Sequence, residues 1–472
     1  MKKFLCVFLT LTIALSLLAC GGSGAADATE GARTAAGLQI GFGREKIMPA
    51  DNITLGGSGT HDRVSEGYLD FLYTTCIAIT DEAGNTVLLV TNDLLNSRKE
   101  YSDPAKGRVS QATGIPVENI MMAATHTHAA PAMGNLSLDG AAAYQEVVLT
   151  GCTNAAQAAL ADRAPAEIFA GTTDAKGLAF SRHYTMGDGT VKKDLASTDI
   201  PMGHPDEPDD DVQIVKFDRG EDKKDVILMT FGVHPTFNGQ ATKKMISADF
   251  PGPTRDYVEA QTGALVAYFT SAAGNQVGDS KVTSERHGME YKDYGKALGQ
   301  VVVDALSGLT ALESGAVKLT QQNFVGTSNK DKIDQLAEAN LVQDEYEKNG
   351  EKFLKPMLEE YGFDSVWEAN AIIDRAKLGA TQLVPLNALS IGGLSMIFAP
   401  YEMFGPNAAY IKANTPYDMT VIITCANGSL GYLPTDAAYD YHVYEGFVTK
   451  FTRGTAENLA DAFLDMLKTL KG

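Results

Sequence analysis

The alternation of short apolar runs with stretches of helical period is the feature that most constrains the fold of this chain. Four stretches with helical character alternate with the apolar runs, at residues 140–161, 251–262, 289–307 and 455–470. Two of the runs flank a turn-forming segment, residues 81–85, and predict a β-hairpin. Seven runs rich in β-branched residues have the length of strands, at residues 74–80, 86–91, 120–125, 226–233, 265–270, 394–399 and 421–425. The pattern predicts an α/β fold with mixed β-sheets and flanking helices.

Two segments interrupt this alternation. Residues 184–212 are rich in Gly, Pro and Asp and predict a long irregular loop, which in a compact domain is often functional. Residues 328–380 are charged and helical in period, and they predict a helical insertion or cap over the α/β core.

The first twenty residues have the layout of a secretory signal peptide. Two lysines precede an apolar run from Phe4 to Leu18, and Leu17-Leu18-Ala19-Cys20 ends it. This junction is typical of a bacterial lipobox, in which Cys20 is lipidated. The alternatives are a signal peptide cleaved without lipidation and a short membrane anchor. We therefore expect a lipoprotein signal peptide over 1–19, a flexible tether over 20–37 and one catalytic domain over 38–472, anchored by lipid in the bacterial cell envelope on the extracytoplasmic side.

Composition narrows the possible partners. The chain has 472 residues, of which 44% are hydrophobic and 21% charged, as in an ordinary globular protein. Its 39 basic and 59 acidic residues give a net charge of −20, which disfavours nucleic acid and anionic lipid headgroups as partners. The three cysteines beyond the leader, Cys76, Cys152 and Cys425, are widely spaced and predict buried free thiols.

Polar residues follow five of the apolar runs directly. His126 and His128 follow the third run, His234 the fourth, Asn275 the fifth, Glu402 the sixth and Tyr432 the seventh. Ligand and catalytic groups of α/β folds gather at the carboxyl ends of strands. His126 and His128 are two residues apart, so a strand would place both rings on one face.

Two imidazoles and a carboxylate with an open position for water form a plausible hydrolytic zinc site. The alternative is that the histidines at the strand ends are structural. The sequence has no H-E-x-x-H, no G-x-S-x-G elbow, no Walker A loop and no G-x-G-x-x-G after a strand.

At these residues the chain resembles the neutral/alkaline (non-lysosomal) ceramidase family, in its catalytic domain. The matching pieces occur in the family's order between about residues 38 and 455: GFGR at 41–44, ATHTHAAP at 124–131, GVHPT at 232–236, SAD at 247–249, AGN at 273–275, PYE at 400–402, GY at 431–432 and YEG at 444–446. The resemblance implies a layered sandwich of sheets and helices, a zinc cofactor and an amidase that cleaves an N-acyl lipid.

The resemblance also implies roles for single residues. The family's zinc ligands correspond to His126, His234, Glu402 and Tyr432, and His128 lies beside the metal. We expect His128, Tyr432 and Arg182 to take part in the reaction, with His128 moving a proton and Tyr432 stabilising an oxyanion. Asn275 and His183 are expected to bind the substrate.

The chain departs from the family pattern where the family carries a serine in a G-N-x-S-P-N segment. Direct alignment places Val277 there, whereas a short gap restores Ser280. The sequence therefore leaves three functions open: an N-acyl lipid amidase of the ceramidase type, a zinc hydrolase of another amide or ester, and a surface lipoprotein that binds a ligand without catalysis. The substrate in the first two cases is a lipid or small molecule.

Overall fold

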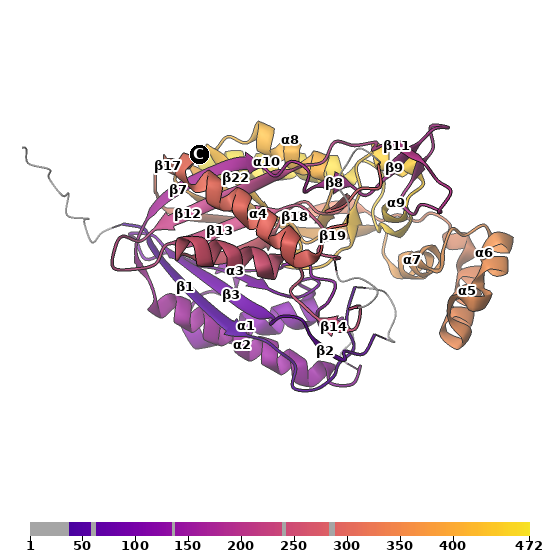
Figure 1. Cartoon of the computed structure of the whole chain (residues 1–472), viewed down its shortest axis with the longest axis horizontal. Coiled ribbons are helices and arrows are strands. Elements are labelled where there is room, and N and C mark those ends of the chain that lie inside the picture. The colour runs from indigo at the N-terminus through magenta and orange to yellow at the C-terminus, as the bar shows by residue number, and fades with distance from the viewer. Residues whose placement is uncertain (1–36, 58–62, 135–136, 238–241, 283–287) are drawn as a thin grey trace, which may run out of the picture. The chain divides into compact units, whose positions relative to one another are not determined.

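A computed structural model describes residues 37–472 except 58–62, 135–136, 238–241 and 283–287. The predicted signal peptide and nearly all of the predicted tether, with Cys20, lie outside the described residues. Residues 36–472 form one compact unit (Figure 1). Within the part that the structure describes, no helix has both the length and the apolar composition needed to cross a membrane.

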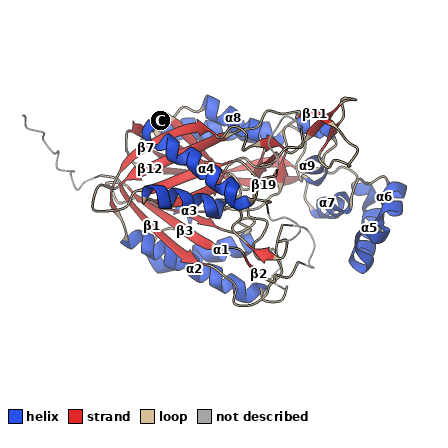
Figure 2. Cartoon of the chain, in the orientation of Figure 1, coloured by secondary structure: helices blue, strands red, loops and turns tan. Residues whose placement is uncertain are grey.

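Three mixed sheets carry the fold (Figure 2). The first has the order β5-β4-β3-β1-β6. Its strands are β1 (Gln39–Lys46), β3 (Tyr73–Thr80), β4 (Thr86–Asn92), β5 (Ile120–Ala124) and β6 (Ala164–Pro165). The second has the order β15-β13-β12-β7-β17. Its strands are β7 (Glu167–Asp174), β12 (Asp211–Asp218), β13 (Val226–Phe231), β15 (Leu265–Thr270) and β17 (Thr310–Leu312).

The third sheet has the order β18-β19-β20-β22. Its strands are β18 (Val317–Thr327), β19 (Thr381–Ile391), β20 (Leu394–Phe398) and β22 (Met419–Ile423). In each of the three sheets one pair of neighbours is parallel: β4 with β5, β13 with β15, and β20 with β22. These pairs include all five strands that the sequence marks by a polar residue at the carboxyl end.

The three sheets share one apolar core, and helices cover their other faces. Alternate residues of a strand point to opposite faces of its sheet. Ile77 and Ile79 of β3 accordingly enter the shared core, whereas Cys76 and Ala78 pack under helices. The covering helices are α1 (Lys99–Thr113) and α2 (Ala141–Ala161) on the first sheet, α3 (Pro251–Thr262) and α4 (Tyr291–Ala305) on the second, and α8 (Gly405–Asn414) and α10 (Thr455–Lys471) on the third. The predicted α/β class with mixed sheets and flanking helices is confirmed.

The predicted elements agree closely with the observed ones where the apolar pattern is strong. Helix α3 covers residues 251–262 as expected, with proline at its start and Gly263 in the left-handed conformation after its end. The hairpin of β3 and β4 forms around residues 81–85, where Asp81 accepts hydrogen bonds from Asn85. Cys76, Cys152 and Cys425 are buried free thiols, as predicted.

The prediction of an irregular loop over residues 184–212 was wrong in part. This segment forms a three-stranded sheet of β9 (Tyr184–Met186), β10 (Val191–Lys192) and β11 (Pro201–Gly203). The first two strands are joined by a turn in which Gly189 has a φ of 84°. The strands are two or three residues long, which is too short for an alternation of apolar and polar residues to show in the sequence.

A helical segment has a small core of its own, and the strands not yet described are short. Residues 328–380 contain α5 (Leu336–Asn349), α6 (Leu354–Tyr361) and α7 (Val366–Lys377), which share a small apolar core of their own. Arg375 of α7 is buried and donates to the carbonyl oxygens of Thr449 and Phe447, beside α9 (Tyr444–Val448). Among the described residues there are also three two-strand ladders: β2 (Gly67–Tyr68) with β14 (Met245–Ile246), β8 (Phe180–Ser181) with β16 (Gln276–Val277), and β21 (Glu402–Met403) with β23 (Tyr432–Leu433).

Candidate metal centre

Hydrogen bonds join the carboxyl ends of strands from all three sheets. The hydroxyl of Thr270, at the end of β15, donates to the carbonyl oxygen of Thr125 at 2.7 Å. The backbone N–H of Thr424, after β22, donates to the carbonyl oxygen of Thr270 at 2.9 Å, and that of Asn427 donates to Met122 of β5 at 2.7 Å. The loops that leave these strands are therefore held together at one place. His126 and Cys425, for example, are in contact there although they are 299 positions apart in the sequence.

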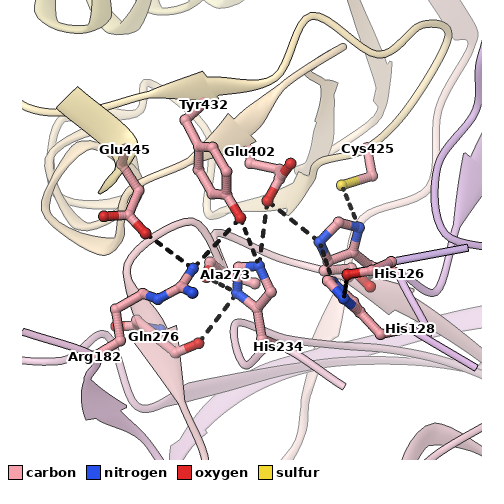
Figure 3. A network of polar contacts seen from close by, with 12 residues as sticks. His126, His128, Arg182, His234, Ala273, Gln276, Glu402, Cys425, Tyr432 and Glu445 are labelled. Carbon is pink, nitrogen blue, oxygen red and sulfur yellow. Dashed lines mark hydrogen bonds and ion pairs between the residues drawn. The ribbon is translucent and has the colours of Figure 1, made fainter. Parts of the chain in front are cut away.

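Three imidazoles meet at this place, those of His126, His128 and His234 (Figure 3). One ligand nitrogen from each lies within 4.8 Å of the others. Each ring uses Nδ1 to contact a backbone carbonyl: those of Leu95, Gly57 and Ala273, at 2.5, 2.9 and 2.6 Å respectively. A proton on Nδ1 makes each of these contacts a hydrogen bond and leaves the lone pair of Nε2 free to bind a metal.

Two oxygen donors complete the cluster, and a short ladder places them side by side. Strands β21 and β23 are parallel, and Glu402 is the register partner of Tyr432. Glu402 Oε2 lies 3.3 Å from His126 Nε2 and 3.2 Å from His234 Nε2. Tyr432 Oη lies 3.2 Å from His234 Nε2, and the Nε2 atoms of His126 and His128 are 3.4 Å apart.

The spacing and chemistry of these donors fit a small divalent cation. Tetrahedral zinc binds nitrogen and oxygen at ~2.0–2.2 Å, which separates neighbouring ligand atoms by about 3.3–3.6 Å. Facing lone pairs and a buried carboxylate repel one another unless a cation or a proton lies between them. The His126, His128 and His234 group can therefore hold a metal ion, with Glu402 and Tyr432 close enough to join it.

The protonation states of His128, His234 and Glu402 favour metal binding, whereas at His126 burial is outweighed by the neighbouring Cys425 and Glu402, which raise the pKa well above its ordinary value. Burial, and then the neighbouring His126 and His234, lower the pKa of His128 well below its ordinary value. Burial lowers the pKa of His234 as well. Burial alone would raise the pKa of Glu402, but His126 and His234 outweigh it and hold that pKa well below its usual range. The neutral imidazole and the ionised carboxylate are the forms that bind metals.

His126 reaches the centre by a route that the sequence does not predict. Strand β5 ends at Ala124, so His126 and His128 lie in the loop after it and not on one strand face. His126 has a φ of 68°, a left-handed conformation that is uncommon outside glycine and that clusters at functional sites. Gly57 has a φ of 94°, and a Cβ atom there would lie 2.7 Å from His128 Nδ1, so only glycine allows its carbonyl to hold that ring.

A buried ion pair stands next to the centre. Arg182 Nη1 lies 3.0 Å from Glu445 Oε1 and donates to Tyr432 Oη at 3.4 Å. His183 Nε2 lies 2.8 Å from Glu445 Oε2. Burial would raise the pKa of Glu445, but Arg182 and then His183 lower it to about 2. Glu445 therefore stays ionised and fixes the guanidinium of Arg182 beside Tyr432.

Asn275 and His183, the expected substrate-binding residues, are fully buried beside Arg182. The carbonyl oxygen of Asn275 accepts from the N–H of Arg182 at 2.8 Å, and its side-chain oxygen accepts from the N–H of Gly405 at 2.9 Å. Gly274 allows this packing, because a Cβ there would lie 2.7 Å from the carbonyl oxygen of Glu402. Their contact with a substrate stays a prediction, and the observed contacts position Arg182.

The two candidates for the family's serine position occupy different surroundings. Val277 belongs to β16 and pairs with Phe180 of β8. Ser280 is buried, and its Oγ lies 3.0 Å from His204 Nε2 and accepts from the N–H of Val282 at 3.1 Å.

The centre borders, through His128 and Tyr432, a cavity of about 500 Å³, a size typical of small-molecule sites. We call the five donors of the centre the floor of this cavity. His128, Arg182 and Tyr432 face this cavity. Its rim comes from β10 and the residues after it, from the start of α7 and from the segment around α9, and includes Lys193, Asp194, Asp364, Trp367, Tyr444 and Phe447.

The sequence patterns assign no role to Glu445 or to the residues of the cavity rim. The only signal for Glu445 was its place in the YEG piece of the family resemblance. Lys193 and Trp367 carried no signal, because nothing in the sequence shows that residues 193 and 367 meet over one cavity.

Comparisons with known proteins agree with the fold. The structure of neutral ceramidase from Pseudomonas aeruginosa superimposes with a TM-score of 0.69 at 17% identity, over 92% of this chain and 74% of that one. A structure of ceramidase complexed with C2 matches equally well, over 92% of this chain and 75% of that one. No protein-family model matches the chain, and no curated protein matches its sequence. The chain has a ceramidase-like fold with a possible metal site.

Proposed function

We propose that this chain is a zinc-dependent amidohydrolase that cleaves the amide bond of an N-acyl lipid such as ceramide. One observation carries the proposal: imidazole, carboxylate and phenol donors converge at ligand spacing on the floor of a cavity. The fold shared with ceramidase structures supports the choice of an amide substrate.

In this proposal His126, His234, Glu402 and Tyr432 hold the zinc, and His128 lies beside it. Glu402 Oε2 is within 3.3 Å of both His126 and His234, which makes these three the tightest group of donors. His128 instead faces the cavity. Among the described imidazoles, its ring has a nitrogen within hydrogen-bond distance of His126 alone. It is therefore placed to contact a substrate as well.

Zinc bound here would supply an activated water and polarise the amide carbonyl. The side chains around it supply the rest. His128, neutral and facing the cavity, accepts and returns a proton. Burial and then Glu402 raise the pKa of Tyr432 while no metal is bound, and its phenol hydroxyl is placed to donate to an oxyanion. Arg182 adds positive charge on the same side, held in place by Glu445.

The charged rim favours a second candidate, a zinc hydrolase of a different and more polar amide or ester. Lys193, Asp194 and Asp364 line the cavity beside the aromatic side chains. A third candidate, a lipoprotein that binds a ligand without turning it over, would use the same cavity.

The test combines metal content with turnover of a fluorescent N-acyl sphingosine by the purified protein. We expect about one zinc per chain, hydrolysis that a chelator abolishes, and recovery when zinc is added back. Zinc without turnover of this lipid, but with turnover of short N-acyl or ester substrates, would favour the second candidate. Zinc without any turnover would favour the third, and absence of zinc would overturn the metal centre.

The proposal includes attachment to the cell envelope through a lipid on Cys20, supported by the lipobox pattern of residues 17–20. A Cys20→Ala variant should leave the membrane fraction. A variant that remains bound to membranes would contradict lipidation at this residue.

A further inference from the structure

A second positive group lies in the cavity, two aromatic rings away from the metal centre. Lys193 follows β10, and its Nζ lies 4.8 Å from the centroid of the Tyr444 ring. Tyr444 packs edge-on against Tyr432 with 5.8 Å between centroids, and Tyr432 Oη is 3.2 Å from His234 Nε2. Lys193 therefore lines the same cavity as Tyr432 and is linked to the metal centre through the edge-on rings of Tyr444 and Tyr432.

The positive charge of Lys193 is poorly neutralised by the protein. Its ion pair with Asp194 spans 3.6 Å, beyond a normal hydrogen bond, and the Asp194 side chain is 91% exposed. The Lys193 side chain itself is only 23% exposed. Burial and then the nearby charge of Arg182 lower the pKa of Lys193. A half-buried cation is thus held near another cation, and its one carboxylate partner within 4 Å among the described residues, Asp194, is exposed to solvent.

The neighbouring lysine shows the difference. Lys192 also lines the cavity, but its Nζ contacts both carboxylate oxygens of Asp199, at 2.9 and 3.1 Å. Arg182 is likewise neutralised, because Glu445 is 3.0 Å away. Asp364 also lines the cavity, but it is exposed at the rim. Of the three described cations that line the cavity, Lys193 is therefore the one whose carboxylate partner is neither buried nor in direct hydrogen-bond contact.

We infer that Lys193 forms a subsite for an anionic group, so that the preferred substrates are N-acyl amides whose amine part carries a carboxylate, sulfonate or phosphate. The anion belongs to the amine part because the acyl part of an N-acyl lipid is an alkyl chain. This inference rests on the proposed function and narrows it. Ceramide carries no such charge and is expected to be a poorer substrate.

The first experiment compares two substrates that differ only in charge, N-dodecanoylglycine and N-dodecanoylglycinamide, with the zinc-loaded full chain. We expect kcat/KM to favour the acid by at least about tenfold, the range of one charge-assisted hydrogen bond. Lys193→Met should lower the acid-to-amide ratio by about tenfold. Lys192→Met removes the adjacent lysine, whose charge Asp199 already neutralises, and should leave the ratio within about twofold.

The second experiment measures binding and needs no turnover. Trp367 is the only tryptophan of the chain and lines the cavity, so its emission reports occupancy. The ligands are the ketone isosteres of the two substrates, in which a methylene replaces the amide nitrogen and prevents cleavage. The acid should bind at least about tenfold more tightly than the amide, and Lys193→Met should remove this preference.

The two experiments separate failure of the subsite from failure of the proposed function. Tighter binding of the acid that depends on Lys193, without hydrolysis of either amide, would keep the subsite and overturn the amidase. Hydrolysis and binding that do not distinguish acid from amide, or a preference that survives Lys193→Met, would overturn the subsite and leave the amidase standing.

Discussion

The floor and the rim of the cavity are built in different ways. The floor, formed by His126, His128, His234, Glu402 and Tyr432, follows strands packed in the shared core of three sheets or lies on a ladder beside them. The rim, which includes Lys193, Trp367 and Tyr444, lies after a two-residue strand, on α7 and at the start of α9. Of these rim elements, α7 packs into the small core of the helical segment.

The two regions suit two different tasks, metal binding and substrate recognition. Metal ligands need fixed geometry, and strand ends tied to a common core supply it, even at the cost of a left-handed His126. Substrate recognition tolerates variation, and surface segments can change without disturbing the core. Changes on the floor should therefore remove chemistry, whereas changes on the rim should alter selectivity, and graded substitutions can test that division.

The largest effect is expected on the floor. His234→Ala removes a buried, proposed zinc ligand and should abolish stoichiometric metal binding, lowering kcat/KM by at least about a thousandfold, or ~4 kcal/mol. Metal analysis of the purified variant together with a turnover assay checks this. His442→Gln, at the rim, is the control and should keep its metal. Full activity in a metal-free His234→Ala protein would contradict the assignment of the chemistry to the floor.

Between floor and rim, Glu445→Gln should cost about 3 kcal/mol of unfolding free energy at neutral pH. The pKa of Glu445 is lowered to about 2 from an ordinary value near 4.5, so its contribution is present above pH 4.5 and is lost as the pH falls towards 2. Denaturant unfolding at pH 7 and at pH 3 should show the difference between wild type and variant shrinking at the lower pH.

The exposed pair of Glu146 with Arg108 supplies the matched control. Their 2.9 Å contact lies at the surface, where an ion pair contributes at most ~1 kcal/mol. Glu146→Gln should therefore be nearly silent at both pH values. An equal cost for the two variants would show that burial of the Arg182–Glu445 pair has no energetic consequence.

The floor is also the part that could be predicted from the sequence. His234 and Glu402 follow long apolar runs, and parallel strands of such runs bring their carboxyl ends together. Arg182 and Glu445 are 263 positions apart, and only the tertiary fold makes them partners. A pairing over that separation leaves no local pattern in the sequence. The two-residue strand β10 and the left-handed φ of His126 leave none either. Residue patterns alone therefore cannot predict these three features.

A smaller effect is expected on the rim. Trp367→Leu removes aromatic surface from the cavity wall and should raise KM about three- to tenfold, or ~1 kcal/mol, with kcat and metal content unchanged. Leu341→Ala on α5 of the same helical segment is 51% exposed and should leave KM unchanged. A loss of metal in the Trp367 variant would show that the rim helps to hold the floor.

The smallest effect on catalysis is expected at Ser280, which does not line the cavity. Ser280→Ala removes the hydroxyl that meets His204 Nε2 at 3.0 Å and accepts from the N–H of Val282, so it should cost about 1 kcal/mol of unfolding free energy. Ser395→Ala loses a similar buried contact, that with Thr420, and should cost about as much stability. Because Ser280 does not line the cavity, kcat/KM should stay within about twofold. A folded, zinc-replete Ser280→Ala protein that had lost a hundredfold in kcat/KM would place this serine in the reaction and would extend the floor beyond the metal ligands.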